Sequence, residues 1–377
     1  MTFVPPFCPN KHCSTHRESL PFDQLWYLRK GFRPTKVVGP VPRFQCRLCG
    51  KGFSQRTFDI DYWVHRPVDY RLVQNLLVGG SGLRQACRTM GVSTRLLANR
   101  HFRLARQSLA LHSQCLDGFR LQEALVFDGF ESFTFSQYYP SNLNLLVTSD
   151  SQFVLGLNAT ILRRKGKMTE DQKKRRTSLE TKWRASPSAI TNSSKELLTY
   201  GCHLSFGAGT VPIVIRTDEK KEYARALRHN PFYGPWIEEG LLVHSTISSK
   251  ASRTRHNPLF PVNYLDRQLR KDLAEHVRET VRFARRIEHS LERAMIHLAH
   301  HNYFKSFRSR FPDKGLTHAQ EAGLDREEVK ILRDRALKER AFGWRFDLER
   351  WQLSLWRRTT SIPVHPVTPL AAHLMTA

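Results

Sequence analysis

The sequence has few acidic residues for the number of basic ones. Its 377 residues include 60 lysines and arginines but only 34 aspartates and glutamates, which gives a formal net charge of +26 at pH 7. A compact chain with this much self-repulsion is favoured when its partner is a polyanion, and nucleic acid releases counterions when its phosphates are neutralised. The charge therefore favours a nucleic-acid-binding protein, with a ribosomal or merely adhesive basic protein as the alternative.

Long apolar runs and a secretory leader are also missing. The apolar segments 143–147 and 211–215 are far shorter than the ~20 residues of a membrane-spanning helix. The chain begins without a basic segment followed by an apolar one. We therefore expect a soluble, intracellular protein that does not enter a membrane. A glycine-rich phosphate loop is absent too, so no nucleotide cofactor is indicated.

Cysteine is scarce and unevenly placed. Of seven cysteines, an odd number, four lie near the start of the chain: Cys8, Cys13, Cys46 and Cys49. This distribution favours metal ligation in a reducing compartment over a disulfide framework. Two closely spaced pairs separated by a longer segment match a structural Zn²⁺ site, and Gly50 and Gly52 suit a zinc knuckle. Residues 1–60 are predicted to form a zinc ribbon, with His12 and His16 as alternative ligands.

Residues 65–112 have the spacing of a helix-turn-helix. One helix is expected over 68–78, where apolar residues recur at helical intervals before two glycines. A second helix begins near Leu83, Gly91 turns the chain, and Ser93 caps a third. The last helix would present five polar side chains to DNA bases or phosphates: Thr94, Arg95, Asn99, Arg100 and Arg103. An ordinary helical hairpin with a glycine turn is the alternative.

Residues 118–305 change to a strand-like pattern in which acids follow apolar runs. The first run ends in Asp128. Three further strand-like segments are expected at 133–138, 142–148 and 153–162. A later buried run, 211–218, ends in Asp218 and leads into a helix. These acids are candidate functional residues, although acids also cap strands and helices routinely.

A basic helix follows these strands. It is expected to begin near Asn263 and to place Asp266 one turn before Arg270. Continued to residue 286, it would carry seven basic side chains: Arg267, Arg270, Lys271, Arg278, Arg282, Arg285 and Arg286. Asp266 is a third candidate acid, although pairing with Arg270 or capping the helix would also explain it.

This order of features resembles the DDE transposases of bacterial insertion sequences. In that family an RNase H-like catalytic domain follows a zinc ribbon and a helix-turn-helix, and the resemblance covers most of residues 1–305. The family usually has glutamate at its third catalytic position, where this chain has Asp266. The resemblance therefore implies a DDD triad of Asp128, Asp218 and Asp266, with Glu288 or Glu292 as alternatives for the third acid.

The resemblance also implies a multidomain fold. We expect a small zinc-ribbon β domain at 1–60, an all-α helix-turn-helix domain at 65–112, and an α/β RNase H-like domain with a mixed sheet and helices at 118–305. A basic insertion at 163–190 would grip phosphates. A helical C-terminal region at 306–360 and a disordered tail at 361–377 complete the chain.

The implied activity is metal-dependent DNA transposition. Three carboxylates could hold two Mg²⁺ or Mn²⁺ ions about 4 Å apart, for strand cleavage at the ends of the element and strand transfer into a target. The expected partner is double-stranded DNA, bound by a homo-oligomer at the nucleoid in the bacterial cytoplasm. The alternatives are a non-enzymatic DNA-binding regulator, such as a decayed transposase, and an RNase H-like nuclease without joining activity.

Overall fold

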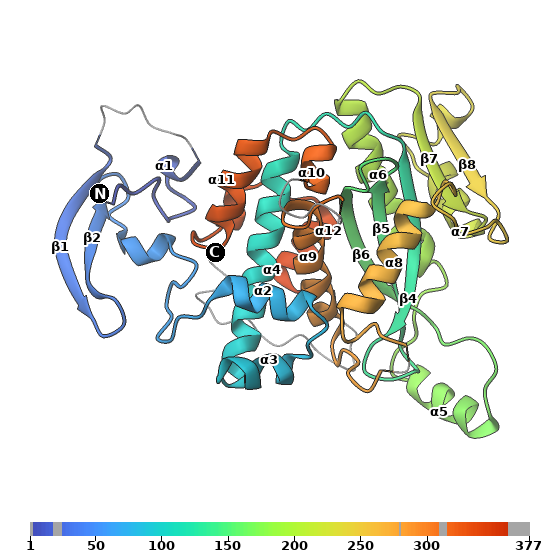
Figure 1. Ribbon diagram of the computed structural model, residues 1–377, viewed down its shortest axis with the longest axis horizontal. Coiled ribbons are helices and arrows are strands. Elements are labelled where there is room, and N and C mark those ends of the chain that lie inside the picture. Colours follow the sequence, from blue (N-terminus) through green and yellow to red (C-terminus); the bar gives the residue numbers. More distant parts are fainter. Residues whose placement is uncertain (1–2, 18–24, 279, 309–314, 361–377) are drawn as a thin grey trace.

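The computed structural model describes residues 3–17, 25–278, 280–308 and 315–360. A small sheet at the N-terminal end, a group of helices and a larger sheet follow one another along the longest axis of the molecule (Figure 1). The chain is therefore a multidomain α/β protein, as predicted. None of the described helices is both long and apolar enough to cross a membrane. The predicted tail, 361–377, lies outside the described residues.

The N-terminal sheet has three antiparallel strands in the order β1-β2-β3. These are β1 (Tyr27–Thr35), β2 (Gly39–Cys46) and β3 (Gly52–Ser54), preceded by the short helix α1 (Ser14–Arg17) and followed by the 3-10 helix η1 (Gln55–Phe58). Aromatic rings fill its core, and Phe342 from the C-terminal part of the chain packs among them. The small domain is thus closed by residues from both ends of the sequence.

Three helices come next: α2 (Tyr70–Val78), α3 (Leu83–Met90) and α4 (Thr94–Leu116). Gly91 has φ +61°, a conformation that glycine adopts without strain, and it ends α3. The hydroxyl of Ser93 accepts the backbone N–H of Leu96 at 3.3 Å and caps α4. The turn between the two helices therefore forms as the sequence pattern predicts.

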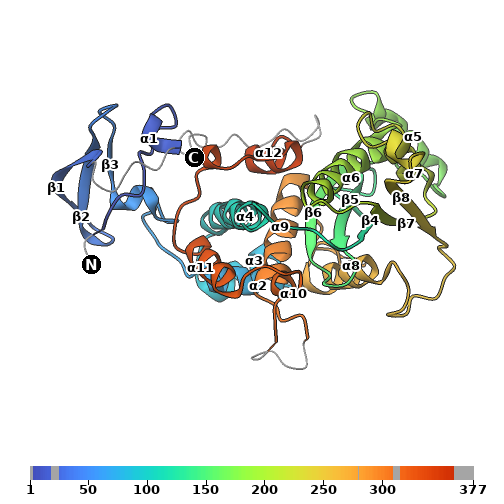
Figure 2. The ribbon, with the colours of Figure 1, turned by 90° about the horizontal axis from the view of Figure 1, so that it is seen from above.

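Helix α4 is buried on all sides over most of its length. It has 23 residues and packs against α9 (Ile287–Tyr303) in the middle of the molecule (Figure 2). Thr94 and Arg95 are exposed, and Asn99 is half-buried. From residue 100 to residue 112 every side chain is buried. The surface available to a ligand is thus confined to the beginning of this helix.

Two of the five predicted DNA contacts point into the protein. Arg100 and Arg103 are 5% and 4% exposed. Arg100 donates to the carbonyl of Arg66 at 2.9 Å, and Arg103 donates to the carbonyl of Ile60 at 2.7 Å. Both also donate to Asn99 Oδ1. These side chains satisfy buried backbone carbonyls instead of facing DNA, which helical spacing alone does not reveal because neighbouring segments cover both sides of α4.

The larger sheet has five strands in the order β6-β5-β4-β7-β8. They are β4 (Leu125–Phe133), β5 (Pro140–Thr148), β6 (Val154–Ile161), β7 (Ile213–Asp218) and β8 (Leu242–Ile247). The first three form an antiparallel meander, whereas β7 runs parallel to β4, and β8 parallel to β7. The strands β4 and β7, which are far apart in the sequence, therefore lie side by side in the centre of the sheet.

Helices cover both faces of this sheet (Figure 2). On one face, α6 (Ala189–Gly207) brings Gly201 against the side chains of Leu125 and Leu146, and α7 (Lys221–Arg228) packs beside α6. On the other face, α8 (Phe260–Asp272) places the Arg270 guanidinium 4.5 Å from the centre of the Phe130 ring. Side chains at alternate positions of β4 thus face different layers.

Two sequence-based expectations about these elements are wrong. Residues 134–139 form a hydrogen-bonded turn between β4 and β5, with Phe135 at φ +66°, and not a separate strand. The long basic helix is interrupted, since α8 ends at Asp272 and α9 begins at Ile287. Leu273 takes an extended conformation and is fully buried with Ala274, so burial of these two residues outweighs helical continuity.

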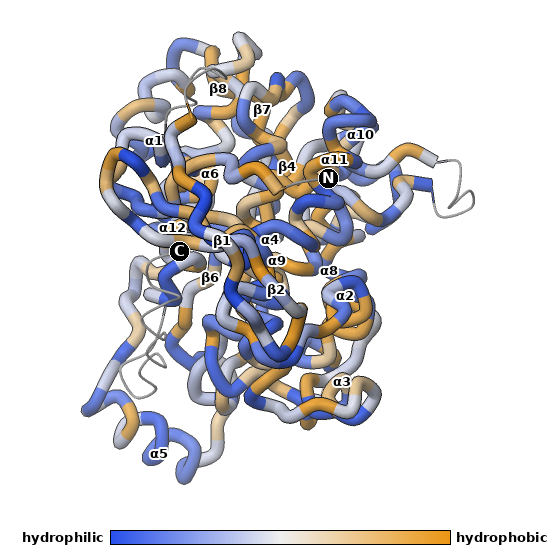
Figure 3. The backbone as a smooth tube through the Cα atoms, turned by 90° about the vertical axis from the view of Figure 1, so that its left-hand side faces the viewer, coloured by the Kyte–Doolittle hydropathy of each residue, from blue (hydrophilic) through white to orange (hydrophobic). Residues whose placement is uncertain are grey.

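The remaining helices lie outside the sheet. In the basic insertion, α5 (Glu170–Glu180) buries none of its residues and stands away from the body of the protein (Figure 3). The C-terminal helices are α10 (His318–Glu321), α11 (Arg326–Ala336) and α12 (Arg350–Arg357), with two 3-10 helices, η2 (Pro235–Ile237) and η3 (Gly343–Arg345), elsewhere. Because α10, α11 and α12 contact α4 or α9, the C-terminal region reinforces the central helices.

Candidate functional site

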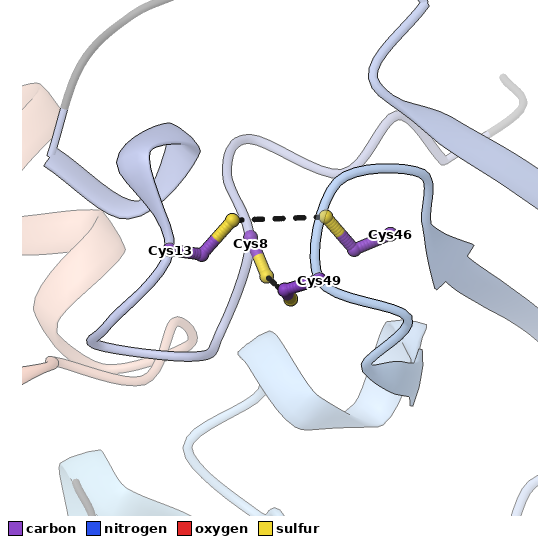
Figure 4. A group of neighbouring side chains, drawn as sticks. All are labelled: Cys8, Cys13, Cys46 and Cys49. Carbon is purple, nitrogen blue, oxygen red and sulfur yellow. Dashed lines mark hydrogen bonds between the residues drawn. The ribbon is translucent and has the colours of Figure 1, made fainter.

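The four N-terminal cysteines come together in one cluster (Figure 4). All four sulfur atoms lie within 4.8 Å of one another, with Sγ–Sγ distances of 3.6 Å for Cys8–Cys49 and 3.8 Å for Cys13–Cys46. Cys46 and Cys49 occupy the tight turn between β2 and β3, where Gly50 has φ +70° and donates to the Cys46 carbonyl. The predicted knuckle therefore forms with its glycine in the conformation it requires.

The cluster has the chemistry of a structural metal site. Three of its cysteines are buried and Cys49 is exposed. Burial raises the pKa of the Cys8 thiol, and neighbouring thiols raise it further. Burial also disfavours ionisation of Cys49, but hydrogen bonds from Asn10 and Lys51 outweigh it and lower its pKa to about 7. Four sulfur ligands at this spacing fit a tetrahedral cation such as Zn²⁺, whose charge would stabilise the thiolates.

The histidine alternatives lie outside this cluster. The Nδ1 atom of His16 is 2.7 Å from the carbonyl oxygen of Cys8, and its ring packs edge-on against Phe7. His12 is exposed. Among the described residues, only the four cysteines gather three or more metal-ligand atoms within 4.8 Å. The sulfur set is therefore the one that fits zinc.

Two of the predicted acids lie on neighbouring parallel strands. Val126 of β4 pairs with Arg216 of β7, so two residues further along each strand bring Asp128 beside Asp218. Burial and the charge of Asp218 both raise the pKa of Asp128, which reaches about 6, while Lys220 opposes the rise. The fold therefore buries Asp128 near a second acid of like charge.

The two carboxylate oxygens of Asp128 have different surroundings. Its Oδ1 accepts the backbone N–H of Gly129 at 2.6 Å and the hydroxyl of Tyr223 at 3.2 Å. Its Oδ2 has no hydrogen-bond partner in the part of the chain that the structure describes. Asp218 Oδ1 accepts the backbone N–H of Lys220 at 3.0 Å. Asp128 therefore has one oriented oxygen and one that remains able to bind a ligand.

Asp266 approaches the same face of the sheet from α8, which packs against β4 and β5. Burial and the charge of Asp128 both raise its pKa, which reaches about 7, while Arg270 and Arg253 oppose the rise. Its Oδ1 is buried and has no hydrogen-bond partner among the described residues. A buried carboxylate oxygen without a partner is costly, and a bound cation would remove that cost.

The two alternative acids belong to a different environment. Glu292 on α9 is 1% exposed and pairs with Arg358, while His101 Nδ1 lies 3.7 Å from its second oxygen. Glu288 lies 3.5 Å from Arg286. Burial raises the pKa of Glu292 to about 7, and Arg358 opposes the rise. Because neither glutamate contributes to the pKa of Asp128 or Asp266, we keep Asp266 as the third acid.

The three aspartates could offer a metal ion only oxygen ligands. Hard divalent cations such as Mg²⁺ and Mn²⁺ prefer such ligands. The carboxylate oxygens do not converge to within 4.8 Å of one another as the cysteine sulfurs do. Carboxylates that hold two ions about 4 Å apart lie farther from one another than the four ligands of a single tetrahedral ion do. The unpartnered oxygens of Asp128 and Asp266 fit metal ligation.

Sequence reasoning identified these acids but missed the residues around them. Tyr223 and Gly129 shape the surroundings of Asp128, and nothing in their spacing indicates that role. Comparison of the sequence with protein-family models and with curated proteins gives no match. The function must therefore be inferred from the chemistry of the site.

Zinc content tests the cysteine cluster. The purified protein is expected to contain about one Zn²⁺ per chain, and Cys46→Ser to lose most of it, because a hydroxyl is a poor replacement for a thiolate ligand. Metal analysis by inductively coupled plasma mass spectrometry measures this directly. Cys87→Ser changes a buried cysteine outside the cluster and is the matched control. Equal zinc content in both variants would contradict the assignment.

Stability without added divalent cations tests whether ionisation of the buried Asp128 is unfavourable in the fold. The folded state raises the pKa of Asp128 from 3.8 to about 6, so ionisation of this group destabilises the fold as the pH rises through that interval. Asp128→Asn removes the penalty and should raise the free energy of unfolding at pH 8 by on the order of 1–3 kcal/mol.

Thermal and urea unfolding at pH 8 and at pH 4 provide the measurement for Asp128→Asn. At pH 4 the gain should be small, because Asp128 is then largely protonated in the folded wild type. A less stable variant at pH 8, or the same gain at both pH values, would show that ionised Asp128 does not destabilise the fold.

Proposed function

We propose that the protein is a DDE-type transposase of an insertion sequence, with Asp128, Asp218 and Asp266 as its catalytic acids. The observation that carries the proposal is that two strands and a helix, distant in the sequence, bring three carboxylates to one face of a mixed sheet. An RNase H-like catalytic domain is part of the proposal. An antiparallel meander followed by two strands parallel to its first strand supports it.

The roles of the acids follow from their surroundings. Bound Mg²⁺ or Mn²⁺ would supply an activated water or 3′-hydroxyl nucleophile and stabilise the leaving oxygen. Asp128 would offer its Oδ2 as a ligand, and Asp218 and Asp266 would offer further carboxylate oxygens. Lys220 and Arg270 lie beside these acids and limit the repulsion among them. These roles as metal ligands would explain why the fold keeps the three carboxylates near one another although their burial and like charges lower stability.

DNA would be bound by basic surfaces on the same side of the molecule. Helices α3 and α5 both lie on the lower side in Figures 1 and 3. The start of α4 exposes Thr94 and Arg95 beside α3. The insertion exposes seven basic side chains: Lys165, Lys167, Lys173, Lys174, Arg175, Lys182 and Arg184. Neutralisation of phosphates by these cations would release counterions and favour duplex binding.

The other parts of the proposal concern the assembly. Recognition of the terminal repeats would fall to the zinc ribbon and the start of α4, as the resemblance implies. Cutting and joining both ends of an element requires at least two active sites, so a homo-oligomer on DNA in a bacterial cytoplasm is the expected working form. A non-enzymatic regulator would need the same binding surfaces but no convergence of Asp128, Asp218 and Asp266.

A cleavage assay tests the proposal. Duplexes carrying the DNA that flanks the gene are incubated with the protein and Mg²⁺ or Mn²⁺, and nicked and joined products are measured. Asp128→Asn, Asp218→Asn and Asp266→Asn should each bind the duplex but lose about 100-fold or more in cleavage rate, since even outer partners of metal ligands are worth 10- to 100-fold.

Glu131→Gln is the matched control for this assay. Glu131 is an exposed acid on the same strand as Asp128, 3.9 Å from Lys220, and its loss should leave cleavage nearly unchanged. A wild type that binds without cutting would favour the regulator. Cleavage without joining would favour the nuclease.

A further inference from the structure

Tyr223 contacts the candidate active site from the opposite layer of the sheet. It lies on α7 and is fully buried. Its ring meets the Phe127 ring edge-on, with centroids 4.9 Å apart and an interplanar angle of 86°. Its hydroxyl donates to Asp128 Oδ1 at 3.2 Å. The Tyr223 side chain therefore extends from α7 to the Asp128 carboxylate on β4.

Gly129 makes this approach possible. A Cβ atom at position 129 would lie 2.8 Å from the Tyr223 hydroxyl oxygen and 2.6 Å from the side-chain amide of Asn142, both shorter than real Cβ contacts. The pairing of β4 with β7 ends at Val126 and Arg216. The two strands are therefore no longer paired at Asp128, where the Tyr223 hydroxyl makes its contact. Glycine after the acid thus provides the space that the hydroxyl occupies.

Packing alone does not account for a hydroxyl at this position. Phenylalanine would fill the space beside Phe127 equally well, and burial of a hydroxyl is unfavourable unless it is hydrogen-bonded. Asp128 is the side chain that satisfies it. The Lys220 ammonium lies 5.3 Å from the centre of the Tyr223 ring, which places a positive charge beside the same group. The hydroxyl is therefore retained where it contacts an acid of the proposed triad.

We propose that Tyr223 is a positioning residue that holds Asp128 Oδ1 by its hydroxyl and so leaves Oδ2 oriented for a divalent cation. Together with the Gly129 N–H, it fixes the carboxylate at two points of one oxygen. A fixed carboxylate loses less conformational freedom when it binds a metal. The inference rests on the proposed function, because it assigns Asp128 as a metal ligand.

The test compares Mn²⁺ binding by Tyr223→Phe with that of the wild type. Binding is followed by electron paramagnetic resonance of free Mn²⁺ in the full-length protein without DNA. Since loss of a partner that orients a metal ligand costs about 10- to 100-fold in metal affinity, the variant is expected to bind Mn²⁺ roughly tenfold more weakly. Incorporation of 4-aminophenylalanine at position 223 restores an N–H donor and should recover most of the affinity.

Tyr200→Phe is the matched control. Tyr200 is a buried tyrosine on α6 that packs against Trp351 and makes no hydrogen bond to the three aspartates. Its variant should bind Mn²⁺ like the wild type. A purely structural role for the Tyr223 hydroxyl would give equal affinities for Tyr223→Phe and Tyr200→Phe, or no recovery with 4-aminophenylalanine, and either result would overturn the inference.

The same titration separates this inference from the proposed function. Mn²⁺ binding that is present in the wild type and abolished in Asp128→Asn supports the proposed metal site. If that pattern holds and Tyr223→Phe behaves like the wild type, the positioning role alone is wrong. If Asp128→Asn binds Mn²⁺ as tightly as the wild type, both proposals are wrong.

Discussion

The pairing of β4 with β7 decides where two of the candidate acids lie. Parallel pairing at Val126 and Arg216 brings Asp128 and Asp218 to the same level on adjacent strands, and their like charges repel. Such an arrangement persists when the surrounding structure is stable enough to hold it. The buried strands β5 and β6 on one side of β4 supply that stability in the centre of the sheet.

The rest of the fold is built around this centre. Helix α8 adds Asp266 to the face that carries Asp128, and α7 adds the Tyr223 hydroxyl through the space that Gly129 leaves. Helix α9 contacts α2, α4 and strand β6 of the larger sheet, and its Ile296 belongs to the core of α2, α3 and α4. The beginning of α4, where Thr94 and Arg95 are exposed, is therefore linked through α9 to the larger sheet.

Several of these features could be predicted from the sequence because local patterns determine them. The spacing of the cysteine pairs indicates a metal cluster, and apolar runs precede Asp128 within β4 and Asp218 at the end of β7. The turn at Gly91 and Ser93 has residues suited to its backbone. In each case the information lies within a few neighbouring positions, so one sequence is enough.

The missed features depend on contacts between distant segments. The burial of Arg100 and Arg103 follows from the carbonyls of Arg66 and Ile60, which helical spacing does not reveal. The end of α8 at Asp272 follows from the burial of Leu273 in the core formed by other elements. The Tyr223 contact requires knowledge that α7 lies behind β4. Tertiary packing decides all three, and no local pattern encodes it.

Mapping of the metal position along the chain tests the central claim most directly. Fe²⁺ bound in place of Mg²⁺ generates hydroxyl radicals with ascorbate and peroxide, and the resulting backbone cuts can be located by mass spectrometry. The account predicts cuts near Asp128, Asp218 and Asp266 together, all suppressed by excess Mg²⁺. Cuts near Glu288 and Glu292, or no Mg²⁺-sensitive cuts at the three aspartates, would contradict it.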